Sequence, residues 1–119
     1  MISELVMFDL PQGITRAEVV AGMREIAPRW RANPDLIRKT FLYDPEGGQA
    51  GALYPWRRKA DAERWHDAAW RQRIVAAYGS APVIRYFETP IVVEERAAGD
   101  GRGSRGHFRL ISSRTWSPR

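Results

Sequence analysis

The spacing of hydrophobic residues changes within the stretch 49–78 from the two-residue period of a strand to the longer period of a helix. In the first part of this stretch, Tyr54 and Trp56 fall on the same face as two alanines, and such alternation predicts a strand. From residue 59 onward the period is helical, and Asp67 is suited to cap a second helical segment. We therefore predict a strand followed by two helices that meet near His66.

Aromatic side chains are concentrated in the same stretch. Trp56, Trp65 and Trp70 lie within fifteen positions, together with His66, which is one of the chain's two histidines. Aromatic rings carry a large hydrophobic area that a cavity or a partner must cover. If the protein acts on a small molecule, we expect this stretch to line the pocket.

The N-terminal part predicts a strand and a helix. Residues 2–9 place hydrophobic side chains on both faces of a strand, with Glu4 on the same face as several of them. Thr15 followed by Glu18 is a capping box, which is a specific signal for the start of a helix. Proline lacks the N–H that a helix interior uses, so Pro28 should kink or end this helix near its last turn.

Three further segments complete the predicted fold. Residues 35–44 alternate again as a strand, and 45–48 (Pro-Glu-Gly-Gly) predict a hairpin turn into the strand that starts at 49. Residues 83–93 predict a final strand that contains Pro90, which favours an edge position or a bulge. The order β-α-β-β-α-β is that of the ferredoxin-like arrangement, an α+β fold with an antiparallel sheet and helices on one face. The uncovered face is also apolar, so we expect a homodimer in which two sheets pack together.

Charge divides the chain into a folded domain at 1–95 and a tail at 96–119. Acidic and basic residues balance at 13 each through Glu95, and the net charge of +5 comes entirely from the tail, which is rich in Arg, Gly and Ser. We expect this tail to be disordered and expect no nucleic-acid partner. The 119 residues contain no cysteine, no signal peptide and no apolar run of membrane-spanning length, so a cytoplasmic protein without membrane association is expected.

Several segments together resemble one known family. The first strand ending in FDLP, the segment PRWRANPDLIRK, the strand AGALYPW and the segment YGSAPVIRYFETPIVV look like the YdhR-like mono-oxygenases. These belong to the dimeric α/β-barrel superfamily, which includes the antibiotic-biosynthesis monooxygenases. The resemblance covers about residues 1–95 and implies a dimeric ferredoxin-like barrel with a pocket between sheet and helices. It also implies oxidation of an aromatic substrate by molecular oxygen without a cofactor, and His66 resembles a helix histidine of the superfamily.

The candidate site residues each have two interpretations. His66 is the candidate catalytic base, because an imidazole titrates near neutral pH, or it is a helix-end histidine that bonds a carbonyl. The candidate substrate-binding residues are Trp56, Trp70, Tyr54, Arg38 and Tyr86. They can stack on, orient or pair with an aromatic ligand. In the alternative interpretation they serve only in core packing and in cross-strand pairs.

The sequence favours no bound cofactor. It contains neither a G-x-G-x-x-G motif nor a P-loop, and no residue cluster has the spacing of metal ligands. Two functions are compatible with these features. One is a cofactor-independent monooxygenase acting on a small aromatic molecule; the other is a non-catalytic small-molecule-binding or stress-associated dimer, with an isomerase or lyase as a third possibility.

Overall fold

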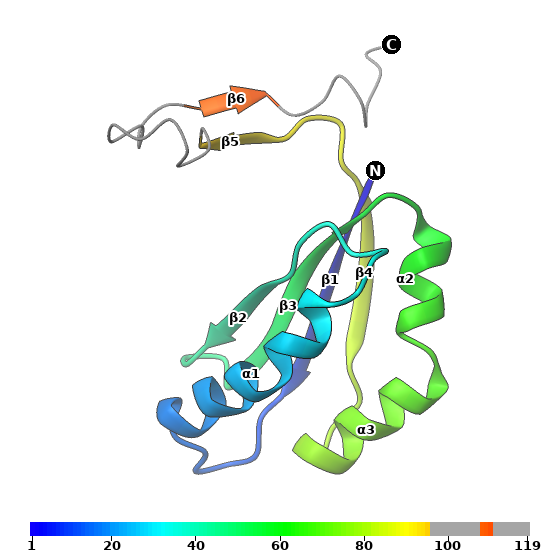
Figure 1. The fold of residues 1–119 in the computed structure, drawn as a ribbon. Coiled ribbons are helices and arrows are strands. Elements are labelled where there is room, and N and C mark those ends of the chain that lie inside the picture. Colours follow the sequence, from blue (N-terminus) through cyan, green and yellow to red (C-terminus); the bar gives the residue numbers. More distant parts are fainter. Residues whose placement is uncertain (96–107, 111–119) are drawn as a thin grey trace.

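The computed structural model describes residues 1–95 and 108–110, and its main body is a four-stranded sheet with three helices (Figure 1). The strands of this sheet lie in the order β2-β3-β1-β4, and every neighbouring pair is antiparallel. The elements are β1 (Ile2–Asp9), α1 (Arg16–Arg31), β2 (Thr40–Asp44), β3 (Gln49–Trp56), α2 (Lys59–Trp65), α3 (Ala68–Tyr78), β4 (Val83–Glu88), β5 (Val93–Glu95) and β6 (Phe108–Leu110). The predicted α+β class is confirmed, and the topology is compatible with a ferredoxin-like fold.

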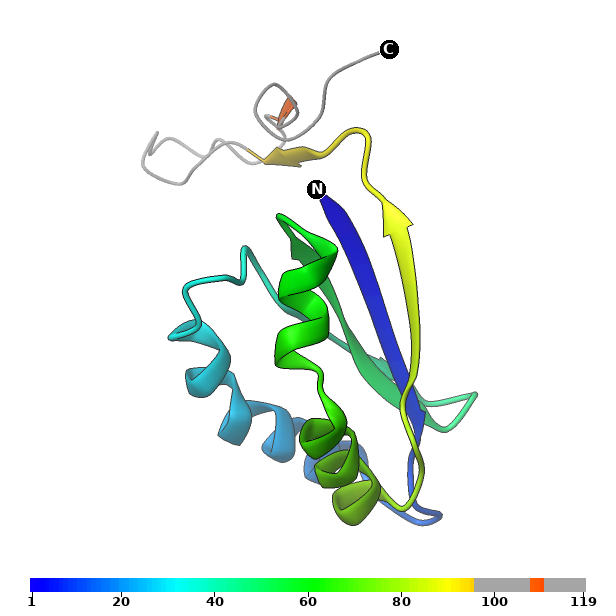
Figure 2. The same ribbon diagram turned by 90° about the vertical axis from the view of Figure 1, so that its right-hand side faces the viewer.

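All three helices lie on one face of this sheet (Figure 2). The core is formed where inward residues of the central strands meet the helices, with Val19 of α1 and Trp70 of α3 among the buried helix residues. The buried residues of β1 and β3 on this face are Glu4, Val6, Phe8, Ala50, Ala52, Tyr54 and Trp56. Their two-residue spacing is that of a strand with one covered face. None of the helices in the described part of the chain is long and apolar enough to cross a membrane.

The predicted capping box starts α1. The Thr15 hydroxyl accepts a hydrogen bond from the Glu18 backbone N–H at 3.1 Å, and the Glu18 carboxylate accepts one from the Thr15 N–H at 2.9 Å. Two backbone donors that the first turn leaves without a helical partner are thereby satisfied. Pro28 lies in the last turn of α1, which ends at Arg31, so the predicted end of this helix is also confirmed.

A break between α2 and α3 brings His66 into the core. His66 has φ −110° and ψ 58°, outside the helical region, and follows directly on the end of α2. The Asp67 carboxylate accepts a hydrogen bond from the backbone N–H of Trp70 at 3.0 Å and so caps α3, as predicted. Gly79 ends α3 with φ 83°, a conformation that glycine adopts without steric cost. The side chain of His66 is consequently buried against the sheet.

The second strand is shorter than the sequence predicts. The predicted strand spans 35–44, whereas β2 begins only at Thr40. The backbone N–H of Asp35 donates to the side-chain oxygen of Asn33 at 2.9 Å, a local turn bond that takes this donor away from the sheet. Leu36 forms only an isolated bridge, to Trp56.

The prediction of one strand across 83–93 is wrong. β4 ends at Glu88, since Pro90 has no N–H with which to continue the sheet, and the chain then leaves the main body (Figure 1). β5 pairs with β6 in a separate antiparallel sheet. β6 falls within the tail predicted to be disordered, and the rest of that tail, 96–107 and 111–119, lies outside the described residues.

Candidate functional site

A fully buried carboxylate lies at the centre of the sheet. Glu4 of β1 is 0% exposed, and the residues directly opposite it on the two neighbouring strands are Tyr54 and Tyr86. A buried charge is costly unless it is paired and hydrogen-bonded. The residues that contact Glu4 therefore indicate the role of this part of the core.

The Glu4 carboxylate is held by Trp56 of β3 and by His66 of the α2–α3 break, and Tyr86 of β4 lies opposite it. The Trp56 indole N–H donates to Glu4 Oε1 at 2.9 Å, and His66 Nδ1 lies 2.8 Å from Oε1 and 3.0 Å from Oε2. Burial, followed by the negative charge of Glu4 and a hydrogen bond to it, raises the pKa of Tyr86 to about 12. Burial and the same charge also raise the pKa of Tyr54. Both phenols therefore stay neutral near pH 7.

The other ring nitrogen of His66 has no partner. Nε2 is buried without a hydrogen bond among the described residues. A carboxylate can only accept hydrogen bonds, so the nitrogen that contacts it must carry the hydrogen. The Glu4 contact therefore favours the tautomer with hydrogen on Nδ1 and a lone pair on Nε2. The pair Glu4–His66, called the dyad below, thus has the composition and order of a carboxylate-oriented base.

Aromatic rings surround the imidazole on several sides. Its centroid lies 4.0 Å from that of Trp70, 4.6 Å from Tyr54, 5.3 Å from Trp30 and 6.0 Å from Trp56. None of these rings offers a hydrogen-bond acceptor or donor to Nε2. An unsatisfied buried nitrogen costs about 1–3 kcal/mol, and such a group in a native structure calls for a specific explanation.

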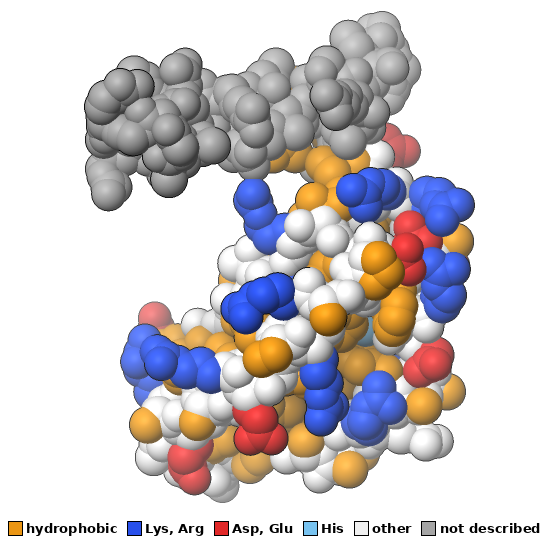
Figure 3. All heavy atoms as spheres, viewed as in Figure 1, with side chains coloured by type: hydrophobic (Ala, Val, Ile, Leu, Met, Phe, Trp, Pro, Cys, Tyr) orange, Lys and Arg blue, Asp and Glu red, His pale blue; other side chains and the backbone are white. Residues whose placement is uncertain are grey.

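A cavity lined by tryptophans adjoins these rings. It has a volume of about 250 Å³ and lies between the C-terminal half of α1 and the α2–α3 junction; its lining residues are Ile26, Arg29, Trp30, Ala32, Asn33, Pro34, Trp65, Trp70 and Arg73. Figure 3 shows hydrophobic side chains in the hollow between α1 and the other two helices, with basic side chains around it. We call this cavity the tryptophan pocket. Trp30 and Trp70 both line it and both contact the His66 ring.

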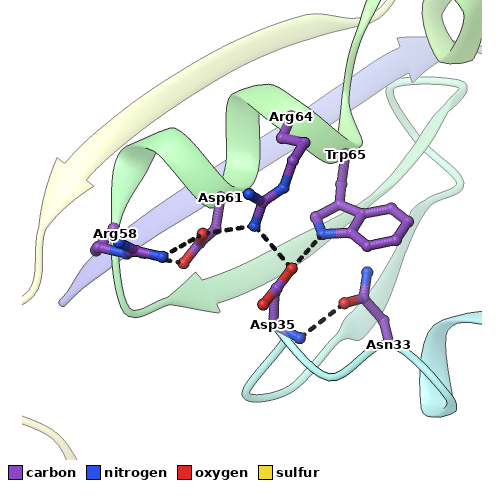
Figure 4. Close-up of polar contacts among 6 residues, drawn as sticks. All are labelled: Asn33, Asp35, Arg58, Asp61, Arg64 and Trp65. Atoms are coloured by element: carbon purple, nitrogen blue, oxygen red, sulfur yellow. Dashed lines mark hydrogen bonds and ion pairs between the residues drawn. The ribbon is translucent and has the colours of Figure 1, made fainter.

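A polar network fixes one wall of the tryptophan pocket (Figure 4). Asp35 accepts hydrogen bonds from the Trp65 indole N–H at 2.9 Å and from Arg64 at 2.8 Å, and Arg64 also pairs with the buried Asp61 at 2.9 Å. The hydrogen bond from Trp65, followed by the charge of Arg64, lowers the pKa of the Asp35 carboxyl. Trp65 is 39% exposed, so Asp35 holds a partly solvated ring in place.

The structure brings together most of the residues predicted for the site. Tyr54, Trp56, His66 and Trp70 form one cluster, and Tyr86 joins it through Glu4. Within that cluster, Trp56 is 0% exposed and lines none of the cavities described here. Arg38 is exposed and lines a different open pocket, of about 290 Å³, on the other side of Trp30, which Lys39 also lines.

Sequence reasoning missed two residues, Glu4 and Lys39. Glu4 had a detectable signal, because an acidic residue on the hydrophobic face of a strand must find a partner. Lys39 had a similar one, since it shares the alternation of Phe41 and Tyr43. Its ammonium lies 4.9 Å from the centroid of Tyr54, on the covered side of the sheet. The neighbouring Arg38 was predicted from the sequence as a substrate-binding residue instead of Lys39.

Comparison with known proteins does not identify a family. The chain matches no family model, and no curated protein is significantly similar to it. Among the described residues, no group of three or more His, Cys, Asp or Glu side chains could hold a metal ion. The resemblance to the YdhR-like mono-oxygenases stays a prediction, and function must be argued from the site.

Proposed function

We propose that the protein is a cofactor-independent monooxygenase that oxidises a small phenolic compound with molecular oxygen. The observation that carries this proposal is the buried dyad, whose Nε2 has no hydrogen-bond partner in the part of the chain that the structure describes. A carboxylate-oriented imidazole is suited to removing a phenolic proton. The tryptophan pocket is suited to an aromatic ring, which can stack on its three indoles, while Arg29 and Arg73 favour a ligand with negative charge.

The proposed reaction uses the dyad as base and then as acid. His66 Nε2 takes the phenolic proton, and Glu4 stabilises the imidazolium that forms. The electron-rich phenolate transfers electrons to oxygen, a carbon–oxygen bond forms, and His66 returns its proton to the peroxide anion to give a hydroperoxide. The neutral imidazole then removes the proton of the oxygenated ring carbon, and the O–O bond breaks to leave a C=O group. The departing hydroxide takes this proton from His66 and leaves as water. One phenol and one oxygen molecule thus give one quinone and one water.

A second candidate function is non-catalytic binding in the same pocket. It is favoured by the position of His66, which contacts Trp30 and Trp70 but is not itself among the residues that line the tryptophan pocket. A substrate reaches Nε2 only if one of these rings moves. If neither ring moves, the pocket binds an aromatic molecule without acting on it, and the dyad is a structural element of the core.

Oxygen uptake distinguishes the two functions. We expect the purified protein to consume oxygen in the presence of one or more small hydroquinones or naphthols, with a quinone that has gained one oxygen atom as product. The measurement is an oxygen electrode combined with product identification by mass spectrometry, and His66→Gln is the control for uncatalysed autoxidation. Tryptophan quenching by the same compounds without oxygen uptake above that control would leave only the binding function.

We propose further that the protein is a homodimer formed by the uncovered faces of two sheets. This face carries Leu5, Met7, Leu42, Leu53, Val83 and Phe87, in alternation with the buried residues. Of these, Leu53 is 37%, Phe87 40% and Val83 64% exposed. An antiparallel sheet is stable with one wet face when that face is polar, and a second copy supplies a matching apolar surface through two-fold symmetry.

Sedimentation tests the dimer. At micromolar concentration we expect twice the chain mass of 13.6 kDa, and we expect Leu53→Glu to shift the protein to monomer because it places a charge in the centre of the interface. Val75→Glu is the matched control, since Val75 is 44% exposed but lies on α3, on the opposite side. A wild-type protein that sediments only at the chain mass would rule the interface out.

A further inference from the structure

Lys39 occupies an unusual position for a lysine. It directly precedes β2, and its Nζ lies 4.4 Å from the ring centroid of Trp30, 4.4 Å from that of Phe41 and 4.9 Å from that of Tyr54. Lysine side chains are mostly exposed. Lys39 is half-buried, and three aromatic rings cover part of its amine.

Among the described residues, no carboxylate forms an ion pair with Lys39. Loss of water disfavours the charged form, and burial lowers the pKa of Lys39 to about 7. A substantial fraction of the amine is therefore neutral, with its lone pair available, at physiological pH.

Lys39 lines a partly open cavity. This cavity has a volume of about 80 Å³ and lies between β1, β3, α1 and α3, where the small side chains of Ala50 and Ala52 leave space opposite Met23 and Ile74. On its other side, Lys39 lines the pocket that also contains Arg38. We call the partly open cavity the lysine cavity. It is separate from the tryptophan pocket, although Ile26 and Trp70 line both. Its walls are almost entirely hydrophobic, so the amine is the main reactive group that an entering molecule meets.

We propose that Lys39 is a nucleophilic amine that captures a small, uncharged aldehyde or ketone as an imine in the lysine cavity. The nitrogen lone pair attacks the carbonyl carbon, a C–N bond forms and the C=O π pair moves to oxygen. The two amine protons transfer to that oxygen, which leaves as water. Desolvated lysines in apolar pockets are the usual source of such chemistry. The size of the cavity selects a carbonyl compound of a few carbon atoms.

This inference is independent of the proposed oxygenase, because it concerns another residue and another cavity. The chain makes the test simple: Lys39 and Lys59 are its two lysines, so only these and the α-amino group can form imines. Lys59 is a useful internal comparison, since it is exposed and its ammonium also lies over a ring, that of Tyr86, at 4.7 Å.

The experiment is reductive trapping with propanal. The full-length protein is incubated at pH 7 with propanal and sodium cyanoborohydride, which reduces an imine to a stable propylamine, and the modified positions are mapped by mass spectrometry. A half-neutral amine holds roughly a thousandfold more of the reactive form than an ordinary lysine does. Restricted access to the cavity reduces this advantage, and we expect Lys39 to be modified at least about tenfold faster than Lys59.

Two controls separate the site from general amine reactivity. In urea the preference for Lys39 should disappear, because it depends on the three aromatic rings that surround Nζ in the folded protein. In Lys39→Arg the remaining two amines should react as they do in the wild type. Modification of Lys59 at the same rate as Lys39 in the folded protein, or no modification of Lys39, would overturn the proposal. Neither outcome would bear on oxygen uptake.

Discussion

Replacement of Glu4 by alanine should lower the free energy of unfolding by about 3–5 kcal/mol, the usual cost of removing one partner from a buried charged pair. The Trp56 indole N–H and His66 Nδ1 both lose their acceptor, and each is fully enclosed. A cavity at the centre of the sheet adds to this cost. Urea denaturation followed by tryptophan fluorescence measures the change.

Two variants calibrate this result. Glu25→Ala removes an exposed carboxylate from α1 and should change the unfolding free energy by less than about 0.5 kcal/mol, as is usual for surface positions. Glu4→Gln should fold and should cost less than Glu4→Ala, since its amide oxygen still accepts from Trp56 and its amide nitrogen can donate to His66. An alanine variant as stable as the wild type would mean that Glu4 does not organise the core.

Glu4→Gln should nonetheless reduce turnover of any phenol identified by oxygen uptake by about 10²–10⁴-fold, the range that a positioned general base contributes. In Glu4→Gln the amide nitrogen replaces Oε2, which lies 3.0 Å from His66 Nδ1, and its N–H favours Nδ1 as an acceptor with the proton on Nε2. His66 Nε2 then has no lone pair with which to act as a base, although the imidazole ring is still in place. The measurement is kcat for wild type and variant, together with substrate affinity from tryptophan quenching.

Tyr86→Phe is the control for this second prediction. It removes the phenol hydroxyl from the residue opposite Glu4 but leaves the carboxylate and its contact with His66 in place. We expect turnover to fall by less than tenfold in this variant. Equal losses in Tyr86→Phe and Glu4→Gln would indicate that general disturbance of the core, and not the tautomer of His66, limits the reaction.

Local signals in the sequence predicted most of the fold. The capping box at Thr15, the cap at Asp67 and the hairpin after β2 each depend on residues within a few positions of one another, and all three are present. The end of β4 was predicted less well. Pro90 pointed to an edge or a bulge, and β4 is an edge strand, but the strand ends at Glu88 and does not continue through the proline. Whether a proline bends a strand or ends it depends on the neighbouring strands, which local sequence does not specify.

The candidate site was predictable only in part for a similar reason. The aromatic residues and His66 are close in sequence, and their concentration was visible. The partner of His66 is Glu4, which lies 62 positions away, and their contact depends on the pairing of β1 with β3 and on the break after α2. The alternation of residues 35–44 likewise gives Lys39 the same face as Phe41, but the rings around its ammonium include Trp30 of α1. Contacts between elements of this kind arise only when the helices dock on the sheet.

The tautomer of His66 is the most direct test of the dyad. ¹⁵N NMR of protein labelled at histidine distinguishes a protonated from an unprotonated ring nitrogen, and His107→Asn assigns the signals because the chain has only two histidines. At pH 8 we expect His66 to carry its proton on Nδ1 and to have an unprotonated Nε2, and we expect Glu4→Gln to reverse this. A wild-type His66 with its proton on Nε2 would contradict the assignment of the dyad as a base.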